Sequence, residues 1–222
     1  MRTLGSKGEE TEKLLREAGV KLIAMHGFEA VSLRMLAKEV GIQAGSLYNY
    51  ITNKQDFLFS LLSEIIKDLN AEMAQAMDGI DDPVDKLRRF IAVHIEFHTR
   101  RKDEVFIGNM ELRSLNRTHR ATIVKMRNAY EDQLKDILSA GIKSGDFQIR
   151  DSKVVRLGLF AMITAVSHWY RPDGPNTIEE LIEEYTALAF DLLRVPAEGE
   201  VAVLAKKGRK AATAQVASSC SS

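Results

Sequence analysis

Residues 32–58 constrain the fold of this chain more than any other segment, because they hold two short helical patterns around one glycine. Apolar residues recur with the i, i+3, i+4, i+7 spacing that places side chains on one helix face: Leu33, Leu36, Ala37 and Val40. Ser32 precedes them as an N-cap, and Gly41 follows them as a residue that readily adopts the left-handed conformation that ends a helix. The segment therefore predicts a short helix with a sharp turn at Gly41.

The residues after Gly41 are small or polar, and Leu47 is the expected inward anchor of a very short second helix over residues 43–50. Such a pair is typical of a helix-turn-helix, whose second helix lies in the DNA major groove. Amide and hydroxyl side chains there contact base edges, whereas tyrosine hydroxyls and a lysine ammonium contact phosphates. The DNA-contacting residues predicted from this pattern are Ser32, Arg34, Gln43, Ala44, Gly45, Ser46, Tyr48, Asn49, Tyr50 and Lys54. Taken alone, the turn also fits an ordinary corner between packed helices, and Arg34 also fits a solvated charge.

The run LAKEVGIQAGSLYNYITNKQDFLFSLL resembles the N-terminal domain of TetR-family transcriptional regulators. Leu47, Tyr48 and Lys54 match the family's pattern. Two residues depart from it, because Gln43 stands where a serine or threonine cap is common and Ile51 replaces a phenylalanine. The resemblance implies a dimeric repressor that leaves its DNA operator when a small inducer binds a second helical domain.

Long 3.6-residue periodicities and only four prolines in 222 residues predict an all-α protein of about nine helices. The resemblance implies that these helices are arranged as in TetR regulators. Its formal net charge is zero, and residues 1–56 hold eight Lys and Arg against seven Asp and Glu. DNA binding must therefore depend on a local basic face and on helix N-termini rather than on bulk charge.

Composition and turn signals divide the chain into four parts. We expect a flexible arm at 1–8, a helix-turn-helix domain at 9–56, a ligand-binding and dimerisation domain at 57–196, and a disordered basic tail at 197–222. A long helix that begins after Asn53 links the two domains, so a tilt of this helix would redirect the DNA-reading helix. Other helices are expected at 9–26, 83–100, 103–115, 118–144, 152–169 and 177–196.

Aromatic and flexible apolar residues in the second domain, with a few polar anchors, are the composition of a ligand pocket. The predicted pocket residues are Phe106, Asn109, Met110, Arg113, Tyr130, Phe160, Ile163 and Trp169. The same side chains also suit a tightly packed core. The run NAYEDQLKDILSAGIKSGDF and the later WYRPDG resemble TetR regulators of fatty-acid, phenylacetate and sterol-ring breakdown. That resemblance implies an acyl-CoA inducer, whose anionic end would need the cations Arg113, Arg117, Arg120 and Arg171.

Apolar residues on more than one face of the last two helices predict a homodimer built on residues 152–169 and 177–196. A two-fold dimer places two DNA-reading helices about one DNA turn apart, so the operator is expected to be double-stranded and near-palindromic.

Other functions receive less support from the sequence. His94 and His98 have the i, i+4 spacing of metal ligands, but histidines packed in a core fit better, so no metal site is predicted. No nucleophile motif or phosphate-binding glycine loop is present, which predicts a non-enzyme without a cofactor. The single cysteine and the absence of a long apolar run predict a cytoplasmic protein with no membrane partner.

Three functions therefore compete. The first is a repressor that senses acyl-CoA or, alternatively, a drug or other lipophilic compound whose efflux it controls. The second is an enzyme that uses the pocket, and the third is a helical interaction protein that no longer binds DNA.

Overall fold

The computed structural model describes residues 4–195, which form nine α-helices and one 3₁₀ helix and contain no strand. The all-α prediction is confirmed. The elements are α1 (Leu4–His26), α2 (Leu33–Val40), α3 (Ala44–Leu47), α4 (Lys54–Met77), α5 (Pro83–Arg100), α6 (Lys102–Met110), η1 (Glu111–Ser114), α7 (Arg117–Ser144), α8 (Ser152–Trp169) and α9 (Ile178–Leu193).

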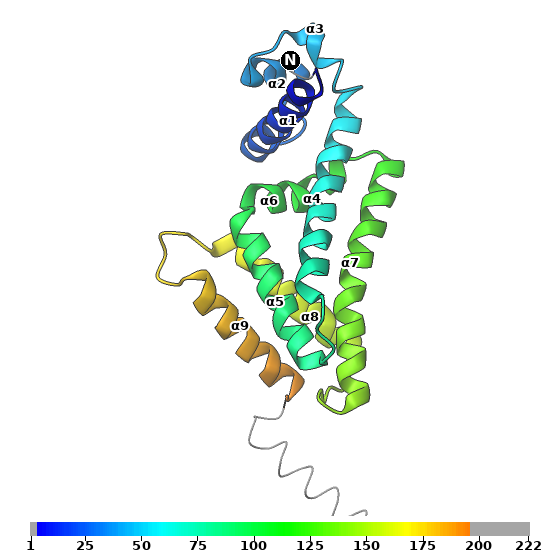
Figure 1. The fold of residues 1–222 in the computed structure, drawn as a ribbon, viewed down its shortest axis with the longest axis vertical. Coiled ribbons are helices and arrows are strands. Elements are labelled where there is room, and N and C mark those ends of the chain that lie inside the picture. The colour runs from blue at the N-terminus through cyan, green and yellow to red at the C-terminus, as the bar shows by residue number, and fades with distance from the viewer. Residues whose placement is uncertain (1–3, 196–222) are drawn as a thin grey trace, which may run out of the picture.

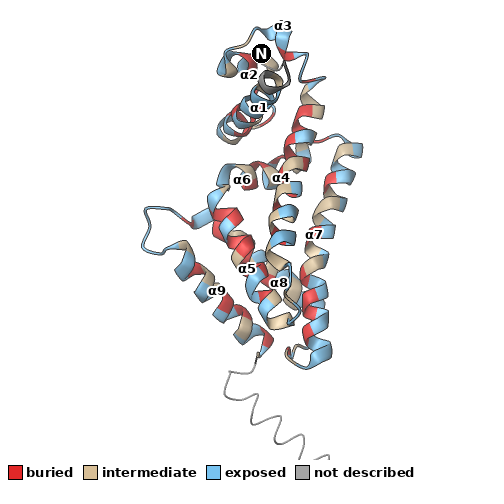
Figure 2. Cartoon of the chain, viewed as in Figure 1, coloured by how far each residue is buried: buried red, intermediate tan, exposed pale blue. Residues whose placement is uncertain are grey.

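Helix α4 joins an N-terminal unit of α1–α3 to a C-terminal bundle of α5–α9 (Figure 1). It runs from the N-terminal unit into the bundle, where it packs between α5 and α7. Helix α5 is the centre of the bundle, since it contacts α4, α7, α8 and α9, and its Phe90, Ile91 and Ile95 are fully buried. Figure 2 shows buried residues along α5 and exposed residues at α3.

The predicted turn at Gly41 is confirmed in detail. The Ser32 hydroxyl oxygen accepts a hydrogen bond from the Met35 amide at 3.2 Å, which caps α2. Gly41 has a φ of 75°, in the left-handed region, and the following amide of Ile42 donates to the Ala37 carbonyl at 2.9 Å. Leu47 is 1% exposed and anchors the second helix.

Helix α3 is shorter than predicted, because only Ala44–Leu47 are helical and the three residues that follow form a turn. The Gln43 side chain makes no capping hydrogen bond, in keeping with its departure from the family pattern. At the other end, the amides of Tyr50 and Ile51 both donate to the Leu47 carbonyl, at 2.9 and 3.0 Å, which closes the segment as a turn.

Three other boundaries differ from the predicted ones. Helix α1 begins at Leu4, so residues 4–8 of the expected arm are helical, while residues 1–3 lie outside the described part. The helix expected at 103–115 divides into α6 and η1, because the buried Glu111 side chain turns back to accept from the Phe28 amide at 3.1 Å. Helix α9 ends at Leu193, where Arg194 adopts a left-handed φ of 52°. The expected tail at 197–222 lies outside the described residues.

Candidate DNA-binding surface and ligand cavity

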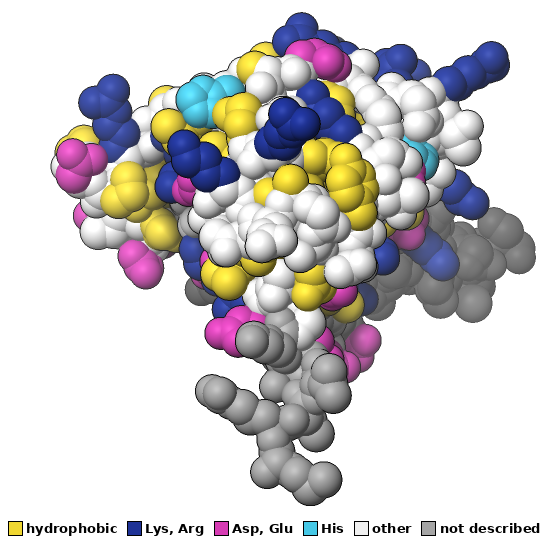
Figure 3. All heavy atoms as spheres, turned by 90° about the horizontal axis from the view of Figure 1, so that it is seen from above, with side chains coloured by type: hydrophobic (Ala, Val, Ile, Leu, Met, Phe, Trp, Pro, Cys, Tyr) yellow, Lys and Arg dark blue, Asp and Glu magenta, His cyan; other side chains and the backbone are white. Residues whose placement is uncertain are grey.

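The residues predicted to read DNA lie together on the exposed end of the N-terminal unit. The exposed members around α3 are Gln43, Ala44, Gly45, Ser46, Tyr48, Asn49 and Tyr50. Tyr48 projects furthest, with 65% of its surface exposed. Figure 3 looks onto this end of the molecule and shows Lys and Arg side chains spread over the view, with Asp and Glu side chains mainly towards its edges. The arrangement places amide, hydroxyl and aromatic groups on one surface that a base edge can reach.

The cationic residues of this surface are held differently. Arg34 is exposed in the first turn of α2. The Lys54 ammonium donates to the Glu29 carbonyl at 3.0 Å and lies 4.3 Å from the centroid of the Phe28 ring. Lys54 therefore also braces the loop between α1 and α2, and its remaining N–H donors stay available for a phosphate.

A second candidate site is a partly open cavity of about 110 Å³ that is lined by α4, α5, α6, α7 and α8. One wall is apolar and comes from α4, through Leu62, Ile65, Ile66 and Leu69. The opposite walls add polar groups from α5, α6, α7 and α8, of which the principal ones are His94, His98, Asn109, Arg127, Tyr130 and Thr164. An apolar cavity with a few convergent polar groups is the usual composition of a small-molecule site.

The structure brings three of the eight predicted pocket residues to this cavity: Asn109, Tyr130 and Phe160. Ile163 is fully buried but is not part of the cavity wall. The other four, Phe106, Met110, Arg113 and Trp169, are exposed and also lie outside its lining. On α6 the residues that face the cavity are Val105, Gly108 and Asn109, and each neighbouring residue is turned about 100° around the helix, which carries Phe106 and Met110 outward.

Sequence reasoning missed five polar residues of the cavity: His94, His98, Arg127, Glu131 and Thr164. The signal for two of them was present, since Arg127 and Glu131 share a helical face with Ile123 and Tyr130 at the i, i+4, i+7, i+8 positions. Charged residues on the apolar stripe of a long helix indicate either a buried ion pair or a binding site.

The two histidines form a stacked pair in which three of the four ring nitrogens are hydrogen-bonded. The His94 ring nitrogens lie 3.0 Å from the Tyr130 hydroxyl and 3.1 Å from the Thr164 hydroxyl, and its ring stacks on that of His98 at 3.7 Å between centroids. His98 Nδ1 donates to the His94 carbonyl at 2.7 Å. Both nitrogens of His94 are therefore occupied, and the i, i+4 spacing produces a stack.

Burial sets the charge state of this cluster. It lowers the pKa of His98 to about 4 and is opposed by the hydrogen bond to the His94 carbonyl, while the nearby Arg127 charge acts in the same direction as burial. Burial and the His98 ring hold the pKa of His94 well below its usual value, and burial raises the pKa of Tyr130. The histidines are thus neutral near pH 7.

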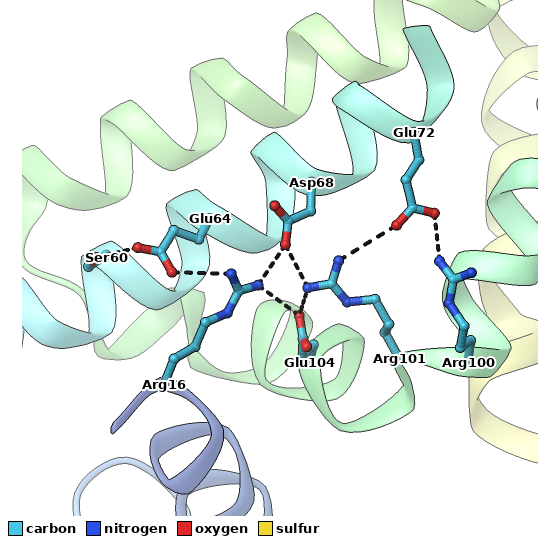
Figure 4. A network of polar contacts seen from close by, with 8 residues as sticks. All are labelled: Arg16, Ser60, Glu64, Asp68, Glu72, Arg100, Arg101 and Glu104. Carbon is cyan, nitrogen blue, oxygen red and sulfur yellow. Dashed lines mark hydrogen bonds and ion pairs between the residues drawn. The ribbon is translucent and has the colours of Figure 1, made fainter. Parts of the chain in front are cut away.

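A network of ion pairs connects the N-terminal unit to the bundle (Figure 4). Arg16 of α1 pairs with Asp68 of α4 at 2.7 Å and with Glu104 of α6 at 3.3 Å, and Arg101 pairs with the same two carboxylates. Burial alone would raise the pKa of Asp68, but hydrogen bonds from Arg101 and Arg16 outweigh it and keep that pKa below its ordinary value. Helix α6 thus contacts α1 on one side and lines the cavity on the other.

The family models match most of the described chain. Residues 15–61 match the model of bacterial regulatory proteins of the tetR family, and residues 80–193 match that of the tetracyclin repressor-like C-terminal domain. The chain belongs to the TetR family. It is therefore a member of a family of transcriptional regulators. Within residues 4–195, no helix of this TetR-family chain combines the length and apolarity needed to cross a membrane.

Three known proteins illustrate the similarity. The transcriptional repressor KstR2 of Mycobacterium tuberculosis is 28% identical over 179 residues, which cover 79% of this chain and 89% of that protein. The fatty acid metabolism regulator protein of Bacillus subtilis is 28% identical over 159 residues, 71% of this chain and 82% of that protein. The crystal structure of AibR in complex with isovaleryl coenzyme A and operator DNA has a TM-score of 0.75 at 25% identity and covers 81% of this chain and 98% of that one.

The buried histidines make the stability of this TetR-family chain depend on pH. An unfolded histidine binds a proton below about pH 6.5, whereas folded His98 stays neutral down to about pH 4, so acid favours the unfolded state in this window. The free energy of unfolding should fall between these pH values, with about 3 kcal/mol of the loss due to His98. The slope of the free energy of unfolding against pH, measured by urea titrations at several pH values, should be shallower in His98→Gln by the contribution of about one proton. His168→Gln, at an exposed histidine, is the control. If that variant changed the slope and His98→Gln did not, the assignment of the pH dependence to His98 would be contradicted.

Proposed function

We propose that this TetR-family chain is a homodimeric transcriptional repressor that leaves its DNA operator when an acyl-CoA thioester binds the cavity. The observation that carries the proposal is the double role of α4. This single helix begins at Lys54, beside the DNA-reading surface, and its Leu62, Ile65, Ile66 and Leu69 form the apolar cavity wall. A ligand that shifts this wall also shifts the base of the helix-turn-helix, as ligand-controlled DNA binding requires.

Two classes of DNA contact are expected to separate in mutants. Lys54→Ala should weaken binding to all sequences alike and reduce the salt dependence by about one unit, because a phosphate contact carries no sequence information. Gln43→Ala and Asn49→Ala should instead change which operator is preferred, since base contacts discriminate by about 1–3 kcal/mol each. Fluorescence anisotropy with operator and scrambled DNA at several salt concentrations measures both effects. Lys67→Ala, exposed on α4 away from α3, is the control for charge, and unchanged sequence preference in every α3 variant would remove α3 from base reading.

Support for the homodimer comes from apolar residues that the folded protomer leaves uncovered on α8 and α9. Val154 is 64% exposed, Leu157 48%, Leu188 50% and Leu192 45%, whereas single protomers rarely expose apolar residues in one stripe. Other apolar residues of the same two helices, Leu159, Val166 and Leu181, are instead buried within the protomer. Such a dimer would present two α3 helices to a near-palindromic operator.

The dimer is testable with exposed leucines of equal size. Leu188→Glu with Leu192→Glu should convert the protein to a monomer in light scattering at micromolar concentration and weaken operator binding, because buried charges in an apolar interface are costly. Leu14→Glu on α1, where the leucine is 45% exposed, is the matched control and should leave the dimer intact. A wild-type monomer, or a dimer that survives the double change, would refute the interface.

An acyl-CoA inducer is supported by two observations. AibR, which shares this fold, was crystallised with isovaleryl coenzyme A and operator DNA. The cavity of about 110 Å³ is also of the order of an engineered cavity that holds a benzene ring, which favours a short or branched acyl group over a long chain. Arg113, Arg117, Arg120 and Arg171 are all exposed and remain the predicted partners of the CoA phosphates.

Release of DNA should therefore follow short acyl thioesters. Titrating isovaleryl-CoA and butyryl-CoA into a protein–operator complex should release the DNA, and ligand and operator should weaken each other's binding by the same factor. Free CoA and the free acids serve as controls. Release by a free acid or by an unrelated lipophile would favour the drug-sensing alternative, whereas no release by any thioester would remove the acyl-CoA assignment. Arg16→Ala should leave each separate affinity nearly unchanged and reduce the mutual factor, because it removes the ion pairs that join α1 to Asp68 of α4 and to Glu104 of α6.

A further inference from the structure

The cavity contains two polar side chains of opposite hydrogen-bonding character that the protein leaves only partly satisfied. His98 supplies an acceptor and Arg127 supplies donors, and both line the cavity. Each is held in place by a bond to the backbone, so neither is free to turn toward a different partner.

The bond that fixes His98 also fixes which of its nitrogens carries the proton. A carbonyl oxygen only accepts hydrogen bonds, so the 2.7 Å contact with the His94 carbonyl places the proton on Nδ1 of His98. In the neutral ring Nε2 is then an acceptor. His98 is 6% exposed, and within residues 4–195 no protein group donates to Nε2.

Arg127 is held by neutral acceptors. Its Nη2 donates to the Gly108 carbonyl and, at 3.2 Å, to the side-chain oxygen of Asn109. Glu131 lies one turn further along α7, but that carboxylate pairs with Arg156 at 3.2 Å. Among the described residues no carboxylate lies within ion-pair distance of Arg127, and the Nη1 and Nε donors make no hydrogen bond.

His98 is buried and Arg127 is half-buried, and polar groups that lose water without gaining a partner cost free energy, so a ligand that satisfies them gains affinity that a hydrocarbon does not. The two groups require different complements. Arg127 requires an oxygen that accepts, and the neutral His98 ring requires a group that donates. A carboxylate satisfies the first and not the second, whereas a carbonyl with a nearby hydroxyl satisfies both.

We propose that the inducer is a hydroxylated acyl thioester, whose carbonyl oxygen accepts from Arg127 and whose hydroxyl donates to Nε2 of His98. This inference rests on the proposed function and narrows the ligand class of the same cavity. His98 acts as the residue that selects for the hydroxyl, and Arg127 as the residue that anchors the acyl carbonyl. Plain acyl thioesters of the same length leave the His98 acceptor unmatched.

The test uses pairs of ligands that differ by one hydroxyl: butyryl-CoA with 3-hydroxybutyryl-CoA, and hexanoyl-CoA with 3-hydroxyhexanoyl-CoA. Each is titrated into the full-length protein bound to operator DNA, and direct binding is measured by calorimetry without DNA. The hydroxylated member of at least one pair should act at a concentration about tenfold lower or more. Equal potency within both pairs would overturn this inference and leave the acyl-CoA assignment intact, whereas failure of all four thioesters to bind would overturn the acyl-CoA assignment together with this inference.

Variants assign the preference to side chains. His98→Phe keeps a stacked ring but removes the acceptor, so the ratio within each pair should fall to about one while plain acyl-CoA binding persists. Arg127→Met should weaken both members of a pair by a similar factor. His168→Phe, at an exposed histidine of α8, is the matched control and should keep the wild-type ratio. If folded His98→Phe kept the wild-type ratio of potencies within each pair, the assignment of the preference to His98 would be overturned. If that variant does not fold, the ratio measured with the wild-type protein decides whether the inducer is hydroxylated.

Discussion

Helix α4 has to satisfy two partners with one continuous backbone, and the rest of the molecule is arranged around that requirement. Its first turns bury Phe57, Leu58 and Leu61 against the N-terminal unit, and its later turns bury Leu69 and Met73 in the bundle. A helix of 24 residues is about 36 Å long, so a tilt of 5° about its far end moves its first residue by roughly 3 Å. That displacement is comparable to a hydrogen-bond length, which is enough to misplace a base contact.

The contact between α1 and α4 is close because of a glycine. A Cβ atom at Gly19 would lie 2.5 Å from the edge of the Phe57 ring, so only glycine lets the two helices approach this far. Around this apolar contact the links to the bundle are polar and partly exposed, with 25% exposure for the Arg16 side chain and 39% for Asp68. Ion pairs at such exposure contribute only about 0–1 kcal/mol each. The N-terminal unit is thus held to α4 by this close apolar contact and by the continuous chain, and to α6 by the packing of α1 and by the ion pairs, so it responds to movement of either helix.

Local signals in the sequence predicted the helix-turn-helix well because its determinants are local. Ser32 and Gly41 form the predicted cap and turn, and Asn53 and Thr177 cap the helices that follow them. All four act through residues within four positions in the chain. The cavity was predicted poorly because the apolar residues of α6, Val105, Phe106, Ile107 and Met110, spread over about half of the helix circumference, so periodicity does not select the face that meets α4. Phe106 and Met110 are predicted as pocket residues because they are large and apolar. Packing instead directs the smaller Gly108 and Asn109 to the cavity. The roles of His98 and Arg127 follow from hydrogen bonds whose partners are fixed only by the folded structure.

The anchoring of Arg127 suggests how a ligand could bind the DNA-bound and DNA-free states of the protein with different affinities. Arg127 of α7 holds the end of α6 through Gly108 and Asn109, and the same helix carries Glu104, which pairs with Arg16. A ligand oxygen that accepts from the unused Nη1 or Nε donors adds a partner to the same guanidinium, so its position is linked through Arg127 to α6. A ligand that displaced neither α4 nor α6 would have equal affinity for the DNA-bound and free states, and would release nothing however tightly it bound. The coupling therefore depends both on how the acyl group fills the apolar wall of α4 and on how the ligand's polar atoms engage Arg127, which holds α6.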